Sequence, residues 1–442
     1  MFARHRNPGW AARLRGFLTI CLIAGLLAAC GGGNDEGAQV EWIEGTPPPE
    51  YISQIQNGGQ TQTPTTAPTP ADGNAPDAEP TATTAPAEQI QPTATATASP
   101  PPADLVTGGL LTDEQLAEFQ PNEIGAIPVL EYHVFTTDAN KEAQFVRTID
   151  DFKTDLQWLY DHGFYVVPLK DVIQDNIKAP AGKKPVVLTF DDSTAGQFRY
   201  LIGADGSVTI DPDSAVGVME AFYAAHPDFG RGGFFAVLPP EYFCFSWQGE
   251  EREDDQNAYC GKKLSWLLDN GYEVGNHTLN HTDLLKVDDD EFRSEIAGAI
   301  EALQEYDSRI EANILAMPFG NYPDADTKQR QRKWLKEGFT WDGQDYLIIG
   351  CLMVGANPTE SPVSTEFDSM WIARIQAFDK DADVDGDGID YWFSVFEDDP
   401  GRLYTSDGDP NIVTVPKDLP GSLDGTLDTD KIAAEGKELV RY

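Results

Sequence analysis

After residue 126 the chain repeats one pattern, in which a short apolar, β-branched run is followed by a stretch with the apolar spacing of a helix. The strand-like runs cover 127–134, 164–168, 185–190, 233–238, 272–276, 313–319, 347–354 and 371–378. The helical stretches include 151–160, 214–225, 263–269 and 289–306. Because strands that alternate with helices form parallel sheets covered by those helices, the pattern predicts an α/β fold.

The N-terminal segment resembles an export signal. Several arginines precede an apolar stretch from Phe17 to Ala29, which ends in the sequence Leu-Ala-Ala-Cys at Cys30. A basic start, a short apolar core and small residues before the cut are typical of a signal peptide, here residues 1–29. The tetrapeptide resembles a bacterial lipobox, which implies cleavage before Cys30, lipid on its thiol and a domain outside the cytoplasm. An uncleaved membrane anchor is the alternative, although the stretch is short for a span.

Residues 30–104 have a composition that does not favour folding. From about residue 45 this segment consists largely of Pro, Thr, Ala and Gln. Such a segment buries too little apolar surface to offset its chain entropy, so we expect a disordered tether that holds the domain away from the membrane. Residues 105–442 remain, enough for one large core.

Polar side chains follow two of the expected strands directly. Asp191 and Asp192 end the run 185–190, and His277 and His281 follow the run 272–276. Because the carboxyl ends of parallel strands share one rim, we expect the four side chains to meet there. Two histidines and one carboxylate suit a zinc-like ion with an open position, and the second aspartate is left as a general base. The alternative is a helix cap and an incidental histidine pair.

These motifs resemble those of the polysaccharide deacetylases with NodB homology, carbohydrate esterase family 4. The resemblance runs from about Ile127 to Phe378 and includes the segments 127–133 and 271–277. It implies a distorted (β/α) barrel with fewer than eight regular units, a divalent metal, commonly zinc, and removal of acetyl groups from N-acetylated sugars. By position, Asp191 matches the catalytic base, and the metal ligands are matched by Asp192, His277 and His281.

The third family motif, an Arg-x-Pro-aromatic-Gly turn, is incomplete in this chain. The matching segment begins with Ala316 and continues through Pro318, Phe319 and Gly320, so the arginine that orients the base in the family is missing. The resemblance still implies that the backbone N–H of Phe319 helps to hold the oxyanion. A tight turn with a core aromatic is the alternative.

The family's general acid, a histidine on the last strand, is also missing. No histidine follows His281, and the matching segment carries Arg374. An arginine cannot give up a proton to a leaving amine, so we expect Arg374 to stabilise negative charge or to bind substrate oxygens. If the strands close into a barrel, the first and last are neighbours, and His133 is then a candidate for the missing acid. A histidine of the core is the alternative.

Two further features lie in less regular segments. Cys244 and Cys260 fall in the second of two apparent insertions, 196–230 and 240–262, and export favours a disulfide between them over two free thiols. An acidic run resembles an EF-hand or dockerin-like calcium loop, although its twelfth position lacks the expected glutamate, and a solvated acidic turn is the alternative. Its candidate ligands are Asp381, Asp383, Asp385 and Asp387.

The charge of the chain restricts its partners. There are 73 acidic and 31 basic residues, for a net charge of −42, which argues against binding of nucleic acid or docking on anionic lipid. We therefore expect a monomeric, exported, lipid-anchored and metal-dependent deacetylase of an N-acetylated polysaccharide of the cell envelope or extracellular matrix. The alternatives are a glycan-binding lipoprotein that holds a metal but has weakened catalysis, and an O-acetyl esterase on the same fold.

Overall fold

The computed structural model describes residues 108–139, 145–239, 244–245, 256–323, 326–355, 357–378 and 388–442. The expected signal peptide, the tether, Cys30 and the four aspartates of the expected calcium loop lie outside these residues. No helix in the described part combines the length and the hydropathy of a membrane span.

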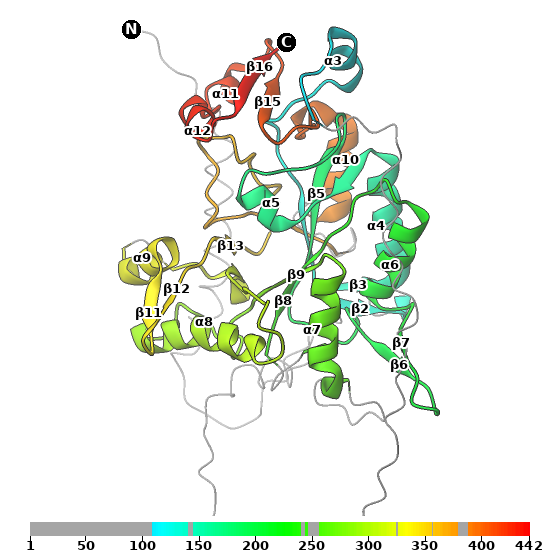
Figure 1. Ribbon diagram of the computed structural model, residues 1–442, viewed down its shortest axis with the longest axis vertical. Coiled ribbons are helices and arrows are strands. Elements are labelled where there is room, and N and C mark those ends of the chain that lie inside the picture. Colours follow the sequence, from blue (N-terminus) through cyan, green and yellow to red (C-terminus); the bar gives the residue numbers. More distant parts are fainter. Residues whose placement is uncertain are drawn as a thin grey trace, which may run out of the picture. The chain divides into compact units, whose positions relative to one another are not determined.

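Within the described residues, eight strands form one parallel sheet (Figure 1). Its order is β13 (Gly350–Leu352), β10 (Ile314–Ala316), β9 (Glu273–Asn276), β8 (Phe234–Val237), β5 (Lys184–Phe190), β1 (Val129–Tyr132) and β14 (Ile375–Gln376), and β4 (Phe164–Val166) pairs with the first half of β5. Burial on both faces explains why these segments are continuous apolar runs rather than alternating ones.

The sheet curls until its two ends meet. Ile372 pairs with Leu352 of β13 through an isolated parallel bridge, and three residues later Ile375 pairs with Leu130 of β1. One short segment thus contacts both the last and the first strand of the order. The expected α/β fold with a curled parallel sheet is confirmed, and so is the expectation that the first and last strands are neighbours.

Helices cover the outer face of the sheet (Figure 1). They include α4 (Ile149–Asp161), α6 (Ala215–Ala225), α7 (Cys260–Asp269) and α8 (Asp289–Gln304). The start of α6 is fixed by Ser214, whose hydroxyl accepts from the Gly217 N–H, and the start of α8 by Asp288, whose carboxylate accepts from two backbone N–H groups. These helices confirm the four helical stretches expected from the sequence, with ends that differ by a few residues.

Shorter elements connect this framework. They are β2 (Val134–Thr136) with β3 (Val146–Thr148), α5 (Leu169–Ile173), the hairpin of β6 (Tyr200–Ile202) and β7 (Val208–Ile210), the 3-10 turns η2 (Asn257–Tyr259) and η3 (Pro318–Gly320), α9 (Gln329–Glu337), and the hairpin of β11 (Phe339–Trp341) and β12 (Gln344–Tyr346). Three expected strands are less than half as long as predicted. The run 313–319 ends as a strand at Ala316, because Pro318 has no N–H for a ladder and Phe319 has a φ of 60°. The runs 347–354 and 371–378 are reduced to β13 and β14.

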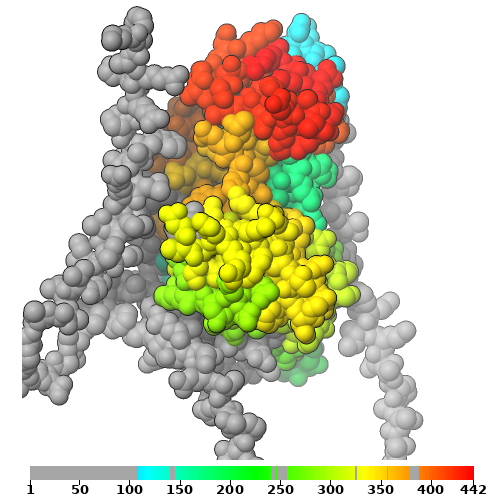
Figure 2. All heavy atoms as spheres, turned by 90° about the vertical axis from the view of Figure 1, so that its left-hand side faces the viewer, coloured from blue at the N-terminus to red at the C-terminus, as the bar shows by residue number. Residues whose placement is uncertain are grey.

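The C-terminal segment adds a small unit that the sequence did not predict. It consists of η4 (Pro400–Arg402), β15 (Ile412–Val415), α11 (Gly421–Asp424), α12 (Thr429–Ala434) and β16 (Glu438–Arg441), and β15 pairs with β16 in parallel. The preceding helix, α10 (Ile389–Asp398), packs against α4 instead, where the Phe393 ring stacks on Trp158. Together with α3 (Asp113–Phe119) the unit lies at one end of the described domain (Figures 1 and 2). The Ser406 N–H donates to the carbonyl of Lys183, immediately before β5. The unit therefore covers the amino ends of the strands and leaves the carboxyl ends to other loops.

Candidate active site

The two aspartates leave the end of β5 in different directions. The Asp191 N–H donates to the Tyr132 carbonyl at 2.9 Å, which continues the pairing of β1 with β5 by one residue. The backbone then turns left-handed, with φ of 72° at Asp192 and 48° at Ser193. The Ser193 hydroxyl accepts from the Leu238 N–H and so ties this turn to the end of β8. Non-glycine residues adopt this conformation at a cost, and such residues concentrate at functional sites.

The loop after β9 directs both histidines toward Asp192. His277 Nε2 lies 3.1 Å and His281 Nε2 lies 3.3 Å from the same oxygen, Asp192 Oδ1. Thr278 and His281 also have left-handed backbones, with φ of 66° and 52°. Asn276, the last residue of β9, stabilises this strained loop, because its side-chain oxygen accepts from the Thr278 N–H at 2.7 Å. The expected cluster of Asp192, His277 and His281 is thus assembled in the structure.

Two contacts of the loop with α8 and β10 fix it further. Glu295 of α8 is buried and accepts from the Asn280 N–H at 3.0 Å. His277 Nδ1 lies 3.0 Å from the carbonyl oxygen of Ala316. A carbonyl only accepts, so Nδ1 carries the proton, and Nε2 of a neutral imidazole presents a lone pair to Asp192.

This arrangement fits a metal ion. The lone pair of His277 Nε2 and a carboxylate oxygen face each other at hydrogen-bond distance, so a proton or a cation is needed between them. His281 Nε2 faces the same oxygen, while its Nδ1 is buried and has no hydrogen-bond partner among the described residues. One carboxylate and two imidazole nitrogens are a common ligand set of catalytic zinc sites.

The charges of the cluster keep both aspartates ionised. Burial opposes ionisation of Asp192. In the absence of a metal, a proton on Nε2 of His277 or His281 lets that ring donate a hydrogen bond to the carboxylate, and these bonds outweigh burial and hold the pKa of Asp192 well below its usual range. Burial also opposes ionisation of Asp191, and the nearby charge of Arg374 more than offsets it, so the pKa of Asp191 is lowered. Although burial acts against it, the pKa of His277 is raised, mainly by the hydrogen bond to Asp192.

Arg374 lies just before β14, beside the candidate base. Its side chain is completely buried, and its guanidinium binds both oxygens of Asp191, with Nη1–Oδ1 and Nη2–Oδ2 distances of 2.8 Å each. Of the two expected roles, stabilising negative charge agrees with this position, whereas binding substrate oxygens does not, because the donors of Arg374 are directed to protein acceptors. The chain instead supplies from its last strand an arginine that contacts the expected base.

His133 lies at the same rim, directly after β1. Its Nε2 is 3.6 Å from Glu131 Oε1 and 4.0 Å from Asp191 Oδ2, and 13% of its side chain is exposed. Its ring meets the edge of the Phe145 ring, with centroids 4.8 Å apart. The structure therefore brings the candidate acid beside the candidate base and leaves part of its ring accessible.

Phe319 lies next to His281. Its ring contacts His281 edge to face, with centroids 4.7 Å apart, and 48% of the residue is exposed. Its φ of 60° places the turn Pro318–Gly320 in a strained conformation. The Phe319 N–H donates to no acceptor among the described residues, so it is available to a ligand.

A disulfide joins Cys244 to Cys260, the pair singled out in the sequence. The neighbouring Phe245 N–H donates to the Ser193 carbonyl at 2.6 Å. The bond therefore links the start of α7 to a backbone segment that contacts the turn after Asp191 and Asp192. Cys351 is a buried free thiol of the core.

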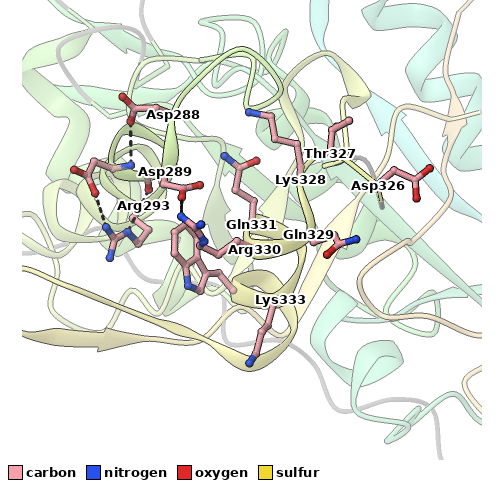
Figure 3. Close-up of a pocket in the computed structure, with 12 residues that line it drawn as sticks. Asp288, Asp289, Arg293, Asp326, Thr327, Lys328, Gln329, Arg330, Gln331 and Lys333 are labelled. Carbon is pink, nitrogen blue, oxygen red and sulfur yellow. Dashed lines mark hydrogen bonds and ion pairs between the residues drawn. The ribbon is translucent and has the colours of Figure 1, made fainter.

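A polar groove between the amino ends of α8 and α9 is separate from this cluster (Figure 3). Its charges are largely matched within the groove, since Arg330 pairs with Asp289 and Arg293 with Asp290. None of the candidate catalytic or metal-binding residues lines it. The chemistry of the described domain therefore points to the strand ends rather than to this groove.

Several supporting residues were missed at the sequence level. They are Glu131, Gln197, Asn276 and Glu295. Gln197 is buried and its amide donates to the backbone carbonyls of His133 and Asp191, which joins the ends of β1 and β5. The position of Asn276 at a strand end is a usable signal, because asparagine often binds backbone two residues on. The others depend on contacts between distant segments.

Comparison with known proteins agrees with this geometry. Residues 249–334 match the family model described as polysaccharide deacetylase. Over this segment the chain is similar to the polysaccharide deacetylase family. The matched segment includes both histidines and the turn at Pro318–Gly320. The family supports deacetylation of a polysaccharide as the activity, and the candidate metal ligands are present.

Solved structures of deacetylases show limited likeness, and no curated protein matches the chain. The deacetylase PplD of Streptococcus pyogenes, in complex with acetate, is 19% identical, with a TM-score of 0.39 over 57% of this chain and 92% of that chain. A polysaccharide deacetylase from Bacillus cereus is 16% identical, with a TM-score of 0.39 over 57% of this chain and 64% of that chain. IcaB from Ammonifex degensii is 16% identical, with a TM-score of 0.38 over 58% of this chain and 94% of that chain.

Proposed function

We propose that this protein is a divalent-metal-dependent deacetylase that hydrolyses the amide of an N-acetylated glycan and releases acetate. The observation that carries the proposal is the pairing of two neighbouring carboxylates with different partners. Asp192 faces the two histidines, whereas Asp191 is ionised, bound to an arginine and not needed as a ligand. Such a division of tasks is what metal-assisted hydrolysis with a separate base requires.

The charge balance of the buried groups supports a divalent ion. Glu131, Asp191 and Asp192 are all buried, and the buried cation Arg374 contacts Glu131 and Asp191. Burial raises the pKa of Glu131. With all three carboxylates ionised and both histidines neutral, these groups and the guanidinium carry a charge of −2. A divalent cation at Asp192, His277 and His281 would neutralise it, and the nitrogen-rich ligand set favours zinc.

The residues around this site account for the steps of an amide hydrolysis. A cation held by Asp192, His277 and His281 would act as a Lewis acid that polarises the acetyl carbonyl. Asp191 takes a proton from the water whose oxygen attacks the carbonyl carbon. The Phe319 N–H donates to the oxyanion that forms on the carbonyl oxygen. His133 gives a proton to the nitrogen as the carbon–nitrogen bond breaks, which releases a free amine and acetate.

We also propose that the protein acts outside the cytoplasm as a monomer, held at the membrane by lipid on Cys30. The basic and apolar N-terminus, the lipobox-like sequence before Cys30 and the Pro- and Thr-rich segment to residue 104 support this proposal. The tether would let the domain reach an envelope or matrix glycan at a distance from the anchor.

The test is acetate release from N-acetylglucosamine oligomers by the zinc-loaded full chain in detergent. Wild type should release acetate, chelation should stop it, and zinc should restore it. Asp191→Asn should retain about one equivalent of zinc but lose turnover, whereas Asp192→Asn should lose both. Zinc binding without release from any N-acetylated or O-acetylated sugar would instead favour a glycan-binding protein. Release from O-acetylated sugars alone would favour an esterase, whose better leaving group depends less on an acid.

A further inference from the structure

Two buried charged residues next to the candidate base have no task in the proposed reaction. Glu131 of β1 is 1% exposed and Arg374, just before β14, is 0% exposed. Removing a carboxylate and a guanidinium from water is unfavourable, and such a pair often stabilises a fold less than apolar residues of the same volume would. Their retention beside Asp191 therefore calls for an explanation other than packing.

The Arg374 side chain is held in place by contacts other than those with Asp191. Its Nε donates to the Met353 carbonyl at 2.7 Å, and Nη1 also donates to the Thr189 hydroxyl at 3.2 Å. These bonds set the plane of the guanidinium. Its two parallel bonds to Asp191, both 2.8 Å long, then set the plane of the carboxylate. Paired bonds of this kind fix geometry as well as charge, and lysine cannot reproduce them.

Glu131 holds the arginine from its other side. Glu131 Oε1 accepts from Arg374 Nη2 at 3.0 Å, and Oε2 accepts from the Gly355 N–H at 2.9 Å. Gly355 allows this close approach, because a Cβ atom at that position would lie 1.8 Å from the carbonyl oxygen of Arg374. Glu131 thus connects β1 with the end of β13 and with the arginine.

The same geometry leaves little reason to assign a second metal here. Donor atoms of Glu131, His133 and Asp191 lie within 4.8 Å of one another. However, Arg374 Nη2 bonds to both Glu131 Oε1 and Asp191 Oδ2, so a guanidinium already bridges the two carboxylates. The cation that this cluster needs is supplied by the chain.

We propose that Glu131 and Arg374 form a buried positioning pair that holds the Asp191 carboxylate in the orientation required of a general base. Neither residue touches the substrate, and the pair acts through Asp191. The inference rests on the proposed function for its kinetic consequence, but its geometric consequence stands without it. A role confined to closing the barrel would affect stability and leave turnover per folded molecule unchanged.

The kinetic test compares Arg374→Met, Arg374→Lys and Glu131→Gln with a matched control, Asp155→Asn. Asp155 also binds a buried arginine, Arg147, with an Nη2–Oδ1 distance of 2.6 Å, but neither of them contacts Asp191. Zinc content and thermal stability are measured with kcat and KM on full-length protein. Because misplacement of a catalytic group by about 1 Å can cost on the order of a hundredfold, Arg374→Met should lower kcat by roughly that factor with little change in KM.

The more conservative variants should lower kcat by smaller amounts. Arg374→Lys keeps the charge without the paired bonds, so its kcat should fall between wild type and Arg374→Met. Glu131→Gln should lower kcat by about tenfold while Arg374 stays bound to Asp191. Asp155→Asn should lose stability and keep its kcat. If the three site variants behave as Asp155→Asn does, the positioning role is wrong and the pair is structural.

Crystal structures separate this inference from the proposed function. In zinc-loaded Glu131→Gln and Arg374→Met proteins, the Asp191 carboxylate should be turned from its wild-type plane while Asp192 and the histidines keep theirs. An unchanged Asp191 in both variants would overturn the proposal even if wild type is active. A turned Asp191 in a protein that never releases acetate would uphold the pair and reject only the proposed reaction.

Discussion

Glu273 gives the sharpest prediction about the stability of this domain. It stands at the first position of β9, and its carboxylate accepts from the N–H groups of Leu169 and Lys170 at 2.6 and 2.9 Å. Burial raises the pKa of Glu273 from the usual 4.5 to about 7, although these two hydrogen bonds oppose the shift. The folded protein therefore holds this proton more tightly than the unfolded chain does.

The direction of the pH effect follows from that difference. Below pH 4.5 the Glu273 carboxyl is protonated in both the folded and the unfolded protein, and its contribution to the free energy of unfolding is then at its maximum. As the pH rises toward 7, the unfolded chain gives up the proton first, so the free energy of unfolding falls, and the loss is complete above about pH 7. A difference of 2.5 pKa units, from 4.5 to about 7, corresponds to at most about 3–4 kcal/mol.

Glu273→Gln removes this titration and keeps the shape of the side chain. The glutamine can accept only one of the two N–H bonds, so at pH 5 the variant should be less stable than wild type by about 1 kcal/mol. By pH 8 the difference in unfolding free energy should shrink or reverse, because only the wild-type protein then carries a buried negative charge at residue 273, which is unfavourable. The assay is urea unfolding followed by tryptophan fluorescence between pH 5 and 8, at constant zinc.

A neighbouring carboxylate supplies the control. Glu311 pairs with Lys170 in solvent, with 58% of its side chain exposed. Glu311→Gln should shift stability by a small amount that does not change across the pH range. If the difference between wild type and Glu273→Gln is equally constant from pH 5 to 8, then Glu273 does not titrate in this range and the argument from its burial is wrong.

Three further predictions concern other parts of the domain. His281→Ala should weaken zinc binding by at least about tenfold in a calorimetric titration and lower thermal stability only slightly, since its ring bonds to Asp192 alone among the described residues; unchanged affinity would remove His281 from the ligand set. The double variant Cys244→Ala with Cys260→Ala should lose about 3 kcal/mol of unfolding free energy, because the bond closes a loop of 16 residues; equal urea midpoints would contradict this. Gly275→Ala should be destabilising by about 1–3 kcal/mol, because its Cβ atom would lie 1.9 Å from the Phe234 ring; a thermal midpoint equal to that of wild type would show that the ring moves aside freely.

The main elements of the barrel could be predicted from local pattern, and the exceptions have physical causes. Runs such as Lys184–Phe190 are apolar throughout because they are buried on both faces, which leaves a clear signal. The strand-like run 313–319 was extended over Pro318 and Phe319, although the same residues were also identified as a turn and the proline should have ended the strand. The pair of β15 and β16 was missed because its partners are 26 residues apart, Ile412 and Glu438, and each strand is only four residues long.

The candidate site divides in the same way. Asp191, Asp192, His277 and His281 could be identified because each follows an apolar strand, and parallel strands present their carboxyl ends at one rim. The contacts of Glu131 with Arg374 and Gly355 span 243 and 224 residues of sequence. No local pattern encodes such a contact, so the partner of Asp191 was not foreseen.

The sequence by itself determined the alternation of strands and helices, the residues at the strand ends and therefore the identity of the candidate base and metal ligands. Those properties depend on spacing along the chain, where burial and periodicity leave a direct trace. The tertiary structure decided what Arg374 does. Closure of the sheet brings β14 beside β1, and the buried guanidinium then has no water to solvate it, so it binds the nearest carboxylates, Asp191 and Glu131. A residue that is charged at every working pH takes its function from its surroundings, and only the folded chain defines them.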